Sequence, residues 1–150
     1  MRIIIQRVTQ ASVEISKVKT SEINKGLLLL VAFEDNDNQT DIDWMIKKIL
    51  GMRIFSDSNQ KMNLSVDDIQ GAILIVSQFT LYASTKKGNR PSFIKSAAPL
   101  KALDLYNQFV KSFQSSTSLS IQTGTFGADM KITSINDGPV SVMLDSKNRE

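Results

Sequence analysis

Cysteine and histidine are both absent from this sequence of 150 residues. Without cysteine there are no disulfide bonds, no thiolate nucleophiles and few options for structural zinc. Without histidine there are no Ser-His triads, no imidazole general bases and almost no catalytic zinc sites. Carboxylate sites for magnesium stay possible, but the aspartates are scattered and lack a loop spacing such as that of an EF-hand. We therefore expect neither a cofactor nor a metal site.

Long apolar runs are missing as well. None approaches the roughly 20 residues that span a bilayer, and residues 1–8 become polar too early for a secretory signal. A cytoplasmic protein with no membrane partner is expected. With 41% hydrophobic and 22% charged residues, the chain has the composition of one globular domain over 1–150. Its tail, about 146–150, is expected to be frayed.

Acidic residues are absent from residues 69–103. The same stretch holds five basic residues, Lys86, Lys87, Arg90, Lys95 and Lys101, although the net charge of the whole chain is only +3. Such local positive charge suits a phosphate backbone. An ordinary solvated basic loop has the same composition, so the charge alone leaves both interpretations open.

Apolar patterns predict the strands as 2–8, 11–16, 27–33, 52–55, 71–83, 119–135 and 139–144. The first three would form a small meander. The last two segments would supply two or three strands, separated by the Asn-Asp-Gly run at 136–138.

Helical spacing appears twice. The first helix is expected to be capped by Thr40 and to end at Gly51, with an apolar face of Ile42, Met45, Ile46 and Ile49. The second, 99–113, has Pro99 in its first turn and an apolar side of Leu103, Tyr106, Val110 and Phe113. Strands with two interspersed helices predict an α+β domain with a curved, mainly antiparallel sheet.

Polar residues interrupt the apolar run of GAILIVSQFTLYA, residues 71–83. The interrupting residues are Ser77, Gln78 and Thr80. Their polar groups are either satisfied by neighbours in the core or directed at a ligand. The pattern therefore marks this segment as a candidate site.

A Gly-Pro pair stands just before an apolar strand in INDGPVSV, residues 135–142. Pro139 has no N–H to donate to a sheet. One interpretation is a tight turn that opens an edge strand. The other is a special backbone geometry, such as a cis bond, that holds carbonyl groups toward a ligand.

Taken together, these motifs resemble the D-aminoacyl-tRNA deacylases of bacteria and eukaryotes, the DTD family. The matching segments follow the family's order over most of the chain: MRIIIQRV, KGLLLLVAFE, RIF, KMNLS, SQFTLYA, KKGNRPSF, FGADM, NDGPVSV and LDS. SQFTLY together with NxGPV is specific, whereas either motif alone would be modest evidence. The resemblance implies a single domain of the DTD-like fold with a barrel-like core, and a homodimer in which the NxGPV segment completes the partner's pocket.

The resemblance implies an enzyme that hydrolyses the ester between a D-amino acid and the 3′-terminal ribose of tRNA. Family members also accept glycine, for example on mischarged tRNA(Ala), and reject L-aminoacyl esters. Such an ester is already activated, so backbone N–H groups around Gln78, Phe79 and Thr80 can serve catalysis by stabilising the oxyanion, with Ser77 beside them. The neighbouring 2′-OH of the tRNA would assist the attacking water. Alternatively Thr80 is a covalent nucleophile, although SQFTLYA holds no base to activate it.

In the family the Gly-Pro bond is cis, so the bond between Gly138 and Pro139 is predicted to be cis. Its rigid carbonyls would exclude an L side chain by a clash and leave a D side chain pointing to solvent. Asn136 belongs to the same motif. Arg7 either holds the Gly-Pro segment of the partner or only flanks a strand. The family usually has threonine where this chain has Ser141, which keeps the hydroxyl and loses a methyl group.

Five further residues complete the predicted site. Met130 lines the adenine site or fills the core, and Phe79 walls the adenosine or belongs to the core. Lys86, Lys87 and Arg90 are expected to bind acceptor-stem phosphates without reading the sequence, which predicts a strong salt dependence.

Two rival functions stay open from the residues alone. One is a non-catalytic nucleic-acid-binding dimer that uses the basic loop. The other is a hydrolase of small esters that uses Thr80 covalently.

Overall fold

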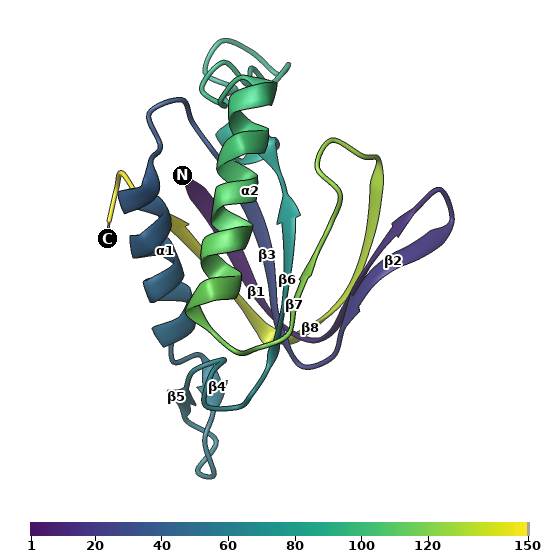
Figure 1. The fold of residues 1–150 in the computed structure, drawn as a ribbon, viewed down its shortest axis with the longest axis vertical. Helices are drawn as coiled ribbons and strands as arrows, with labels where there is room; N and C mark the ends of the chain where they lie inside the picture. The colour runs from purple at the N-terminus through teal and green to yellow at the C-terminus, as the bar shows by residue number, and fades with distance from the viewer. Residues whose placement is uncertain (150) are drawn as a thin grey trace.

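The computed structural model describes residues 1–149, in which a curved sheet is covered by two helices on one face (Figure 1). The elements are β1 (Arg2–Ile15), β2 (Val18–Ile23), β3 (Gly26–Ala32), α1 (Gln39–Gly51), β4 (Phe55–Ser56), β5 (Met62–Leu64), β6 (Ala72–Ser77), the 3₁₀ turn η1 (Phe79–Tyr82), α2 (Pro99–Ser116), β7 (Ile121–Thr123) and β8 (Met130–Asp145). The predicted α+β class with two principal helices and a barrel-like sheet is confirmed.

The main sheet has the order β2-β1-β3-β6-β7, and β8 also pairs with β1. β1 runs antiparallel to β2, β3 and β8, as predicted for most of the sheet. The pairs β3–β6 and β6–β7 are parallel. Parallel neighbours need long crossovers, and the segments that hold α1 and α2 supply them. β6 therefore lies inside the sheet with a strand on each side.

Both faces of the central strands are buried. Leu27, Leu29 and Ile75 pack beneath the helices, whereas Leu28 and Leu74 belong to a second cluster on the other face, where the sheet curls upon itself. Strands buried on both sides have continuous apolar sequences, which explains the runs in β3 and β6. Because both of their faces are packed, β3 and β6 hold the residues at their ends in defined positions.

The first strands differ from the prediction. The predicted strands 2–8 and 11–16 are one strand, β1, because no glycine or proline interrupts the chain between them. β1 bends where its register with β8 shifts on either side of Val8. β2 follows as an unpredicted strand, and β1 lies between β2 and β3. The predicted meander is therefore wrong.

The helices begin and end close to the predicted residues. Asn38, not Thr40, caps α1: its side chain accepts the N–H of Thr40 at 2.9 Å, and Asp41 accepts the N–H of Asn38 at 3.1 Å in a capping box. Gly51 is the last residue of α1, as predicted. Pro99 opens α2 as predicted.

The buried face of α2 is Ala102, Leu105, Tyr106, Phe109 and Phe113. Leu103 and Val110, which were predicted to line it, are only half-buried. The apolar residues of this helix allow two overlapping stripes, and Phe109 decides between them by packing against Phe33 at 6.3 Å between ring centroids.

The tail is held against the domain up to Arg149. Ser146 is buried and accepts a hydrogen bond from the amino group of Met1 at 2.7 Å. Lys147 pairs with Asp41 at 2.7 Å, and the guanidinium of Arg149 lies 4.7 Å from the ring centroid of Trp44. The prediction of a frayed tail is wrong for these residues, and residue 150 lies outside the described part. Within that part, neither helix combines the length and the apolar content that crossing a membrane requires.

Candidate active site

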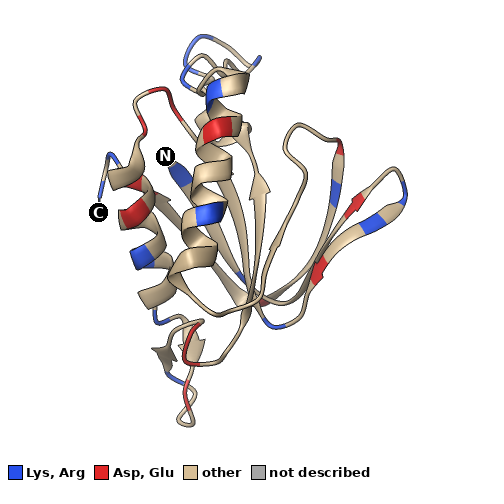
Figure 2. Cartoon of the chain, viewed as in Figure 1, with Lys and Arg blue, Asp and Glu red and all other residues tan. Residues whose placement is uncertain are grey.

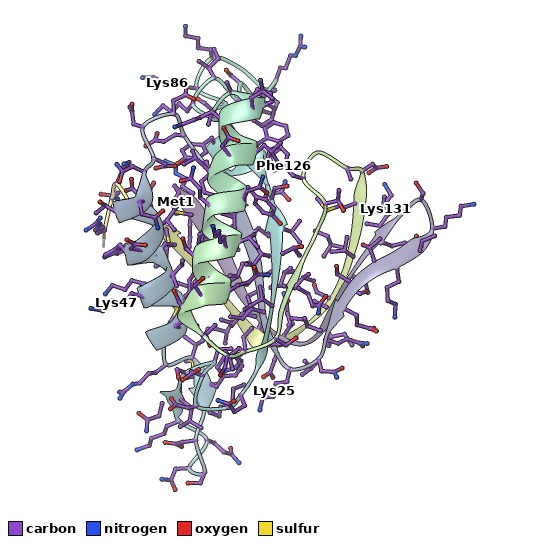
Figure 3. The ribbon with its side chains drawn as sticks, in the orientation of Figure 1. Met1, Lys25, Lys47, Lys86, Phe126 and Lys131 are labelled. Carbon is purple, nitrogen blue, oxygen red and sulfur yellow. The ribbon has the colours of Figure 1, made fainter. Side chains whose placement is uncertain are left out.

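An open cavity of about 650 Å³ lies where β3 and β6 end, beside the start of α2. It is lined mainly by apolar side chains, with Ser77, Gln78, Ser96 and Asp129 as the polar contributors. Phe126 points from the loop before β8 toward α2 and lies 5.7 Å from Tyr106, centroid to centroid (Figure 3). An apolar cavity with few polar groups is the usual form of a small-ligand site.

The polar interruption of residues 71–83 marks the end of β6. The predicted strand stops at Ser77, and residues 79–82 form the turn η1 instead. Gln78 leaves the strand conformation with φ −145° and ψ 71°, and its carbonyl accepts the N–H of Leu81 at 3.1 Å. Ser77, Gln78 and Phe79 line the cavity, so the interruption faces an open space.

The backbone donors of this segment are not equivalent. The N–H of Gln78 donates to the carbonyl of Val31 at 2.7 Å and is therefore occupied. The first N–H that bonds inside the turn is that of Leu81. The N–H groups of Phe79 and Thr80 precede it and have no partner within the turn, as at the start of any helix. The expected donor set around 78–80 is thus reduced to Phe79 and Thr80.

Thr80 is half-buried and is not among the residues that line the cavity. Its hydroxyl accepts a hydrogen bond from the side-chain amide of Gln78. Among residues 1–149 no carboxylate or lysine is bonded to the Thr80 hydroxyl. A side-chain amide is no general base, so the surroundings of Thr80 suit a positioning role.

The Gly-Pro pair lies within β8, which continues through 136–138 instead of being broken there. The bond between Gly138 and Pro139 is cis, as predicted. Asn136, Gly138 and Pro139 are exposed, and none of them lines the cavity of the chain that carries them. The other edge of β8 pairs with no strand in the described part of the chain.

Arg7 is buried and holds this segment. Its Nε donates to the carbonyl oxygen of Asp137 at 3.0 Å and lies 3.2 Å from the Asp137 carboxylate. Its Nη1 donates to the carbonyl of Ile54, which ties the segment to the chain before β4. Arg7 thus contacts the Gly-Pro segment of its own chain, and contact with the segment of a partner stays a prediction.

The predicted site residues therefore form two groups. Ser77, Gln78, Phe79 and Met130 meet at the cavity. Asn136, Gly138, Pro139 and Arg7 lie together elsewhere on the chain, with Arg7 joined to Asp137.

Two aromatic residues of the cavity lining were not assigned to the site from the sequence. Phe93 and Phe126 line the cavity, and they lie in the motifs KKGNRPSF and FGADM that carried the resemblance. Position within those motifs was the only signal that could have identified them.

Ordinary acid-base groups are scarce at the cavity. Burial raises the pKa of Tyr106 to about 12, and its hydroxyl donates to the carbonyl of Ile75 at 3.0 Å. Asp129 is exposed and pairs with Lys131 at 3.2 Å. Within residues 1–149 the structure gathers no group of three or more carboxylate, imidazole or thiol side chains that would suit a metal ion. Among the residues that line the cavity, Asp129 is thus the one carboxylate.

Lys86, Lys87 and Arg90 are exposed on a loop, residues 84–98, that we call the basic loop. Paired backbone hydrogen bonds of 2.8 and 2.9 Å between Ser84 and Ser92 close its first part. The loop lies beyond the amino end of α2, and its charged positions are all basic (Figure 2). Phe93 connects it to the cavity.

Known proteins match this chain over its full length. The sequence model of the family described as D-Tyr-tRNA(Tyr) deacylase matches residues 4–145. Proteins named D-aminoacyl-tRNA deacylase from Flavobacterium johnsoniae and Flavobacterium psychrophilum are 60% and 56% identical over all of both chains. A solved structure named c-Myc DNA Unwinding Element Binding Protein has a TM-score of 0.92 at 37% identity, covering 97% of this chain and 98% of that one. With its motifs, fold and cavity in agreement, this chain belongs to the D-Tyr-tRNA(Tyr) deacylase family.

Proposed function

We propose that this protein hydrolyses the ester bond of D-aminoacyl-tRNA, releasing a free D-amino acid and tRNA. Relatives up to 60% identical over the whole chain carry that activity in their names. The observation that carries the proposal is the cavity at the end of β6, where the backbone N–H groups of Phe79 and Thr80 have no partner within the turn, and where the one carboxylate in the lining, Asp129, is paired with Lys131. That arrangement suits an ester that is already activated.

The N–H groups of Phe79 and Thr80 stabilise the oxyanion. They stand at the amino end of η1 with no partner inside the turn, and Phe79 borders the cavity. Donors held in this way lower the barrier without reorganising during the reaction, and one such donor contributes roughly 10²–10³-fold. The 2′-OH beside the ester then assists the attacking water, because the one carboxylate that lines the cavity, Asp129, is paired with Lys131.

The segment 136–139, which we call the gate segment, serves the cavity of a second copy. Gly138 and Pro139 are exposed, lie outside their own cavity and stand in an edge strand. An edge strand with unpaired backbone groups is a ready surface for a symmetric dimer. Carbonyl groups brought to the partner's cavity would clash with an L side chain and would admit D-amino acids and glycine.

The basic loop binds the tRNA backbone. Lys86, Lys87 and Arg90 project beyond the cavity, and the stretch 69–103 contains no acidic residue to oppose them. Contacts to phosphates carry no sequence information, which suits an enzyme that acts on many tRNAs.

Hydrolysis of D-tyrosyl-tRNA, L-tyrosyl-tRNA and glycyl-tRNA(Ala) by the purified protein tests the proposal. We expect rapid loss of the D and glycyl esters and no loss of the L ester, with no effect of a chelator. Cleavage of no ester above the rate in buffer would defeat the proposal. Equal cleavage of D and L esters would support the hydrolase activity but would contradict the role of Gly138 and Pro139 in rejecting L-amino acids.

A non-catalytic nucleic-acid-binding protein is the second candidate. The structure with a TM-score of 0.92 is named as a DNA-element-binding protein, and the basic loop suits any phosphate backbone. Retained RNA binding with no ester hydrolysis would favour this function.

The covalent use of Thr80 is testable separately. A Thr80→Val variant keeps the size of the side chain and removes the hydroxyl. We expect a loss of roughly tenfold, in line with a positioning hydrogen bond. Abolished turnover, together with an acyl-enzyme trapped on the unaltered protein and seen by mass spectrometry, would establish the nucleophile instead.

A further inference from the structure

The two most exposed large apolar side chains in residues 1–149 each follow, in the sequence, a residue that lines the cavity. Ile94 is 92% exposed and Leu100 is 81% exposed. Ile94 directly follows Phe93 in the sequence and Leu100 directly follows Pro99, and both of these neighbours line the cavity. Both side chains are therefore open to solvent and are attached to the segments of backbone that line the cavity.

The apolar surface continues into the cavity. Phe79 is 56% exposed and packs edge-to-face against Phe93, with 5.1 Å between ring centroids. We call Phe79, Phe93, Ile94 and Leu100 the apolar rim. Single exposed apolar residues are common on proteins, but a set that borders one cavity marks an interaction site.

Two of the four rim residues, Ile94 and Leu100, are each followed by a lysine. Lys95 follows Ile94 and Lys101 follows Leu100, both lysines are exposed, and 69–103 lacks any acidic residue. The chemistry that complements this alternation is a polyanion with exposed flat apolar groups. Single-stranded nucleic acid has both, because its bases are unpaired and its phosphates stay charged. A duplex or an acidic protein surface would offer the charge without the free bases.

The backbone between the rim residues Ile94 and Leu100 is fixed to the core. The N–H of Ala97 donates to the carbonyl of Phe33 at 2.9 Å, and the N–H of Ala98 donates to the Asp35 carboxylate at 3.2 Å. A surface held before binding loses less conformational entropy on binding.

We propose that the apolar rim binds the unpaired nucleotides that precede the 3′-terminal adenosine of tRNA. Their bases pack on Ile94 and Leu100, and their phosphates pair with Lys95 and Lys101. The identity of the RNA rests on the proposed function, whereas binding to the rim can be measured without hydrolysis. The rim thereby extends the RNA surface from Lys86, Lys87 and Arg90 to the cavity.

Binding of two RNA hairpins tests this inference, one with a short unpaired 3′ overhang and one blunt. Fluorescence anisotropy compares the unaltered protein with the double variant Ile94→Ser, Leu100→Ser. We expect the unaltered protein to prefer the overhang and the variant to lose roughly tenfold on that hairpin alone. The matched control is Val18→Ser, since Val18 is 63% exposed on β2 and apart from the rim; it should bind both hairpins normally.

The lysines give an independent measurement. In the double variant Lys95→Gln, Lys101→Gln, the slope of log affinity against log salt should fall by roughly one for each lysine on the overhang hairpin. An unchanged slope would overturn the assignment of the phosphates.

Two other outcomes overturn the proposal. In the first, the Ile94→Ser, Leu100→Ser variant keeps its full preference for the overhang. In the second, sedimentation shows that this variant is a monomer while the unaltered protein is a dimer, so that a second copy covers the rim. Failure of the protein to cleave D-tyrosyl-tRNA would defeat the proposed function and leave the hairpin result readable.

Discussion

The segment 77–80 and the gate segment 136–139 are held in opposite ways. The first follows β6, which is buried on both faces and has a strand on each side. Its polar groups are tied to their own chain, with the N–H of Gln78 on Val31 and the Gln78 amide on Thr80. The second lies in an edge strand and is exposed, with Arg7 as its buried anchor.

This difference teaches how the two segments divide the work. A segment held by the core keeps backbone donors in place for an oxyanion inside its own chain. A segment held from behind by Arg7 directs its outer side to whatever molecule lies outside. This contrast supports the proposal of a site shared between two subunits.

The largest expected effect comes from removing a backbone donor in the core-held segment. Phe79 is the first residue of η1, where proline is tolerated, so Phe79→Pro deletes the N–H with little change of backbone. We expect a loss of roughly 10²–10³-fold in kcat for D-tyrosyl-tRNA. Phe79→Ala removes the ring and keeps the N–H, and should lose much less. Equal losses in single-turnover assays would assign the effect to the ring and not to the donor.

A change in the gate segment should come next. A Cβ on Gly138 would lie 2.8 Å from Nη2 of Arg7 and 3.1 Å from Cγ2 of Val140, at a φ of +121° that side chains rarely adopt. Gly138→Ala should therefore displace the segment and lower kcat/KM by roughly a hundredfold. Gly51→Ala is the control, since its Cβ meets nothing within 4 Å. A fully active Gly138→Ala enzyme would show that the position of the gate segment does not matter.

Weakening the contacts between Arg7 and the gate segment tests the comparison further. Arg7→Lys keeps the charge but cannot reach Asp137 and Ile54 together with the planar fork of arginine. We expect a loss of about 1–3 kcal/mol in the free energy of unfolding and roughly tenfold in kcat/KM. Chemical denaturation and steady-state kinetics measure the two effects. A variant that is destabilised yet fully active would show that Arg7 contributes to stability and not to activity.

The smallest effect is expected away from both segments. Burial alone would raise the pKa of Asp41, but hydrogen bonds from Lys147, Ser146 and the N–H of Asn38 lower it. The stabilisation that this carboxylate supplies is therefore present above pH about 4, the usual range of an unfolded aspartate, and is lost as pH falls through the lower pKa of the folded state. Asp41→Asn should cost about 1 kcal/mol at neutral pH through the capping box.

Thermal unfolding as a function of pH checks this prediction. The Asp41→Asn variant should lose less stability than the unaltered protein between neutral pH and the acid range, and its hydrolysis per folded molecule should be normal. A changed kcat in a fully folded Asp41→Asn variant would contradict the expectation that Asp41 has no influence on the candidate active site.

The two segments also differ in how far the sequence could predict them. The apolar run predicted the strand β6, because burial on both faces leaves a strong pattern, whereas the catalytic role of its polar interruption stays a prediction. The change from strand to turn after Ser77 was not visible, since FTLY is compatible with either. The occupied N–H of Gln78 depends on Val31, a contact between distant residues.

For the gate segment, motif resemblance predicted the cis bond correctly, whereas local pattern wrongly placed a break at 136–138. Its separation from the cavity of its own chain was implied only by the family resemblance, which predicts a homodimer. Other errors were choices between equivalent residues, such as Asn38 and Thr40 as the cap of α1, which only the geometry of the helix start decides.

A heterodimer tests the central claim most directly. One subunit carries Phe79→Pro and the other carries Gly138→Ala, and the mixed dimer is isolated with two different affinity tags. If each cavity takes its gate from the partner, one of the two sites is fully intact, and D-tyrosyl-tRNA should be hydrolysed at about half the rate of the unaltered dimer while both homodimers are inactive. A mixed dimer as inactive as the two homodimers would show that each site is built within one chain and would contradict the account.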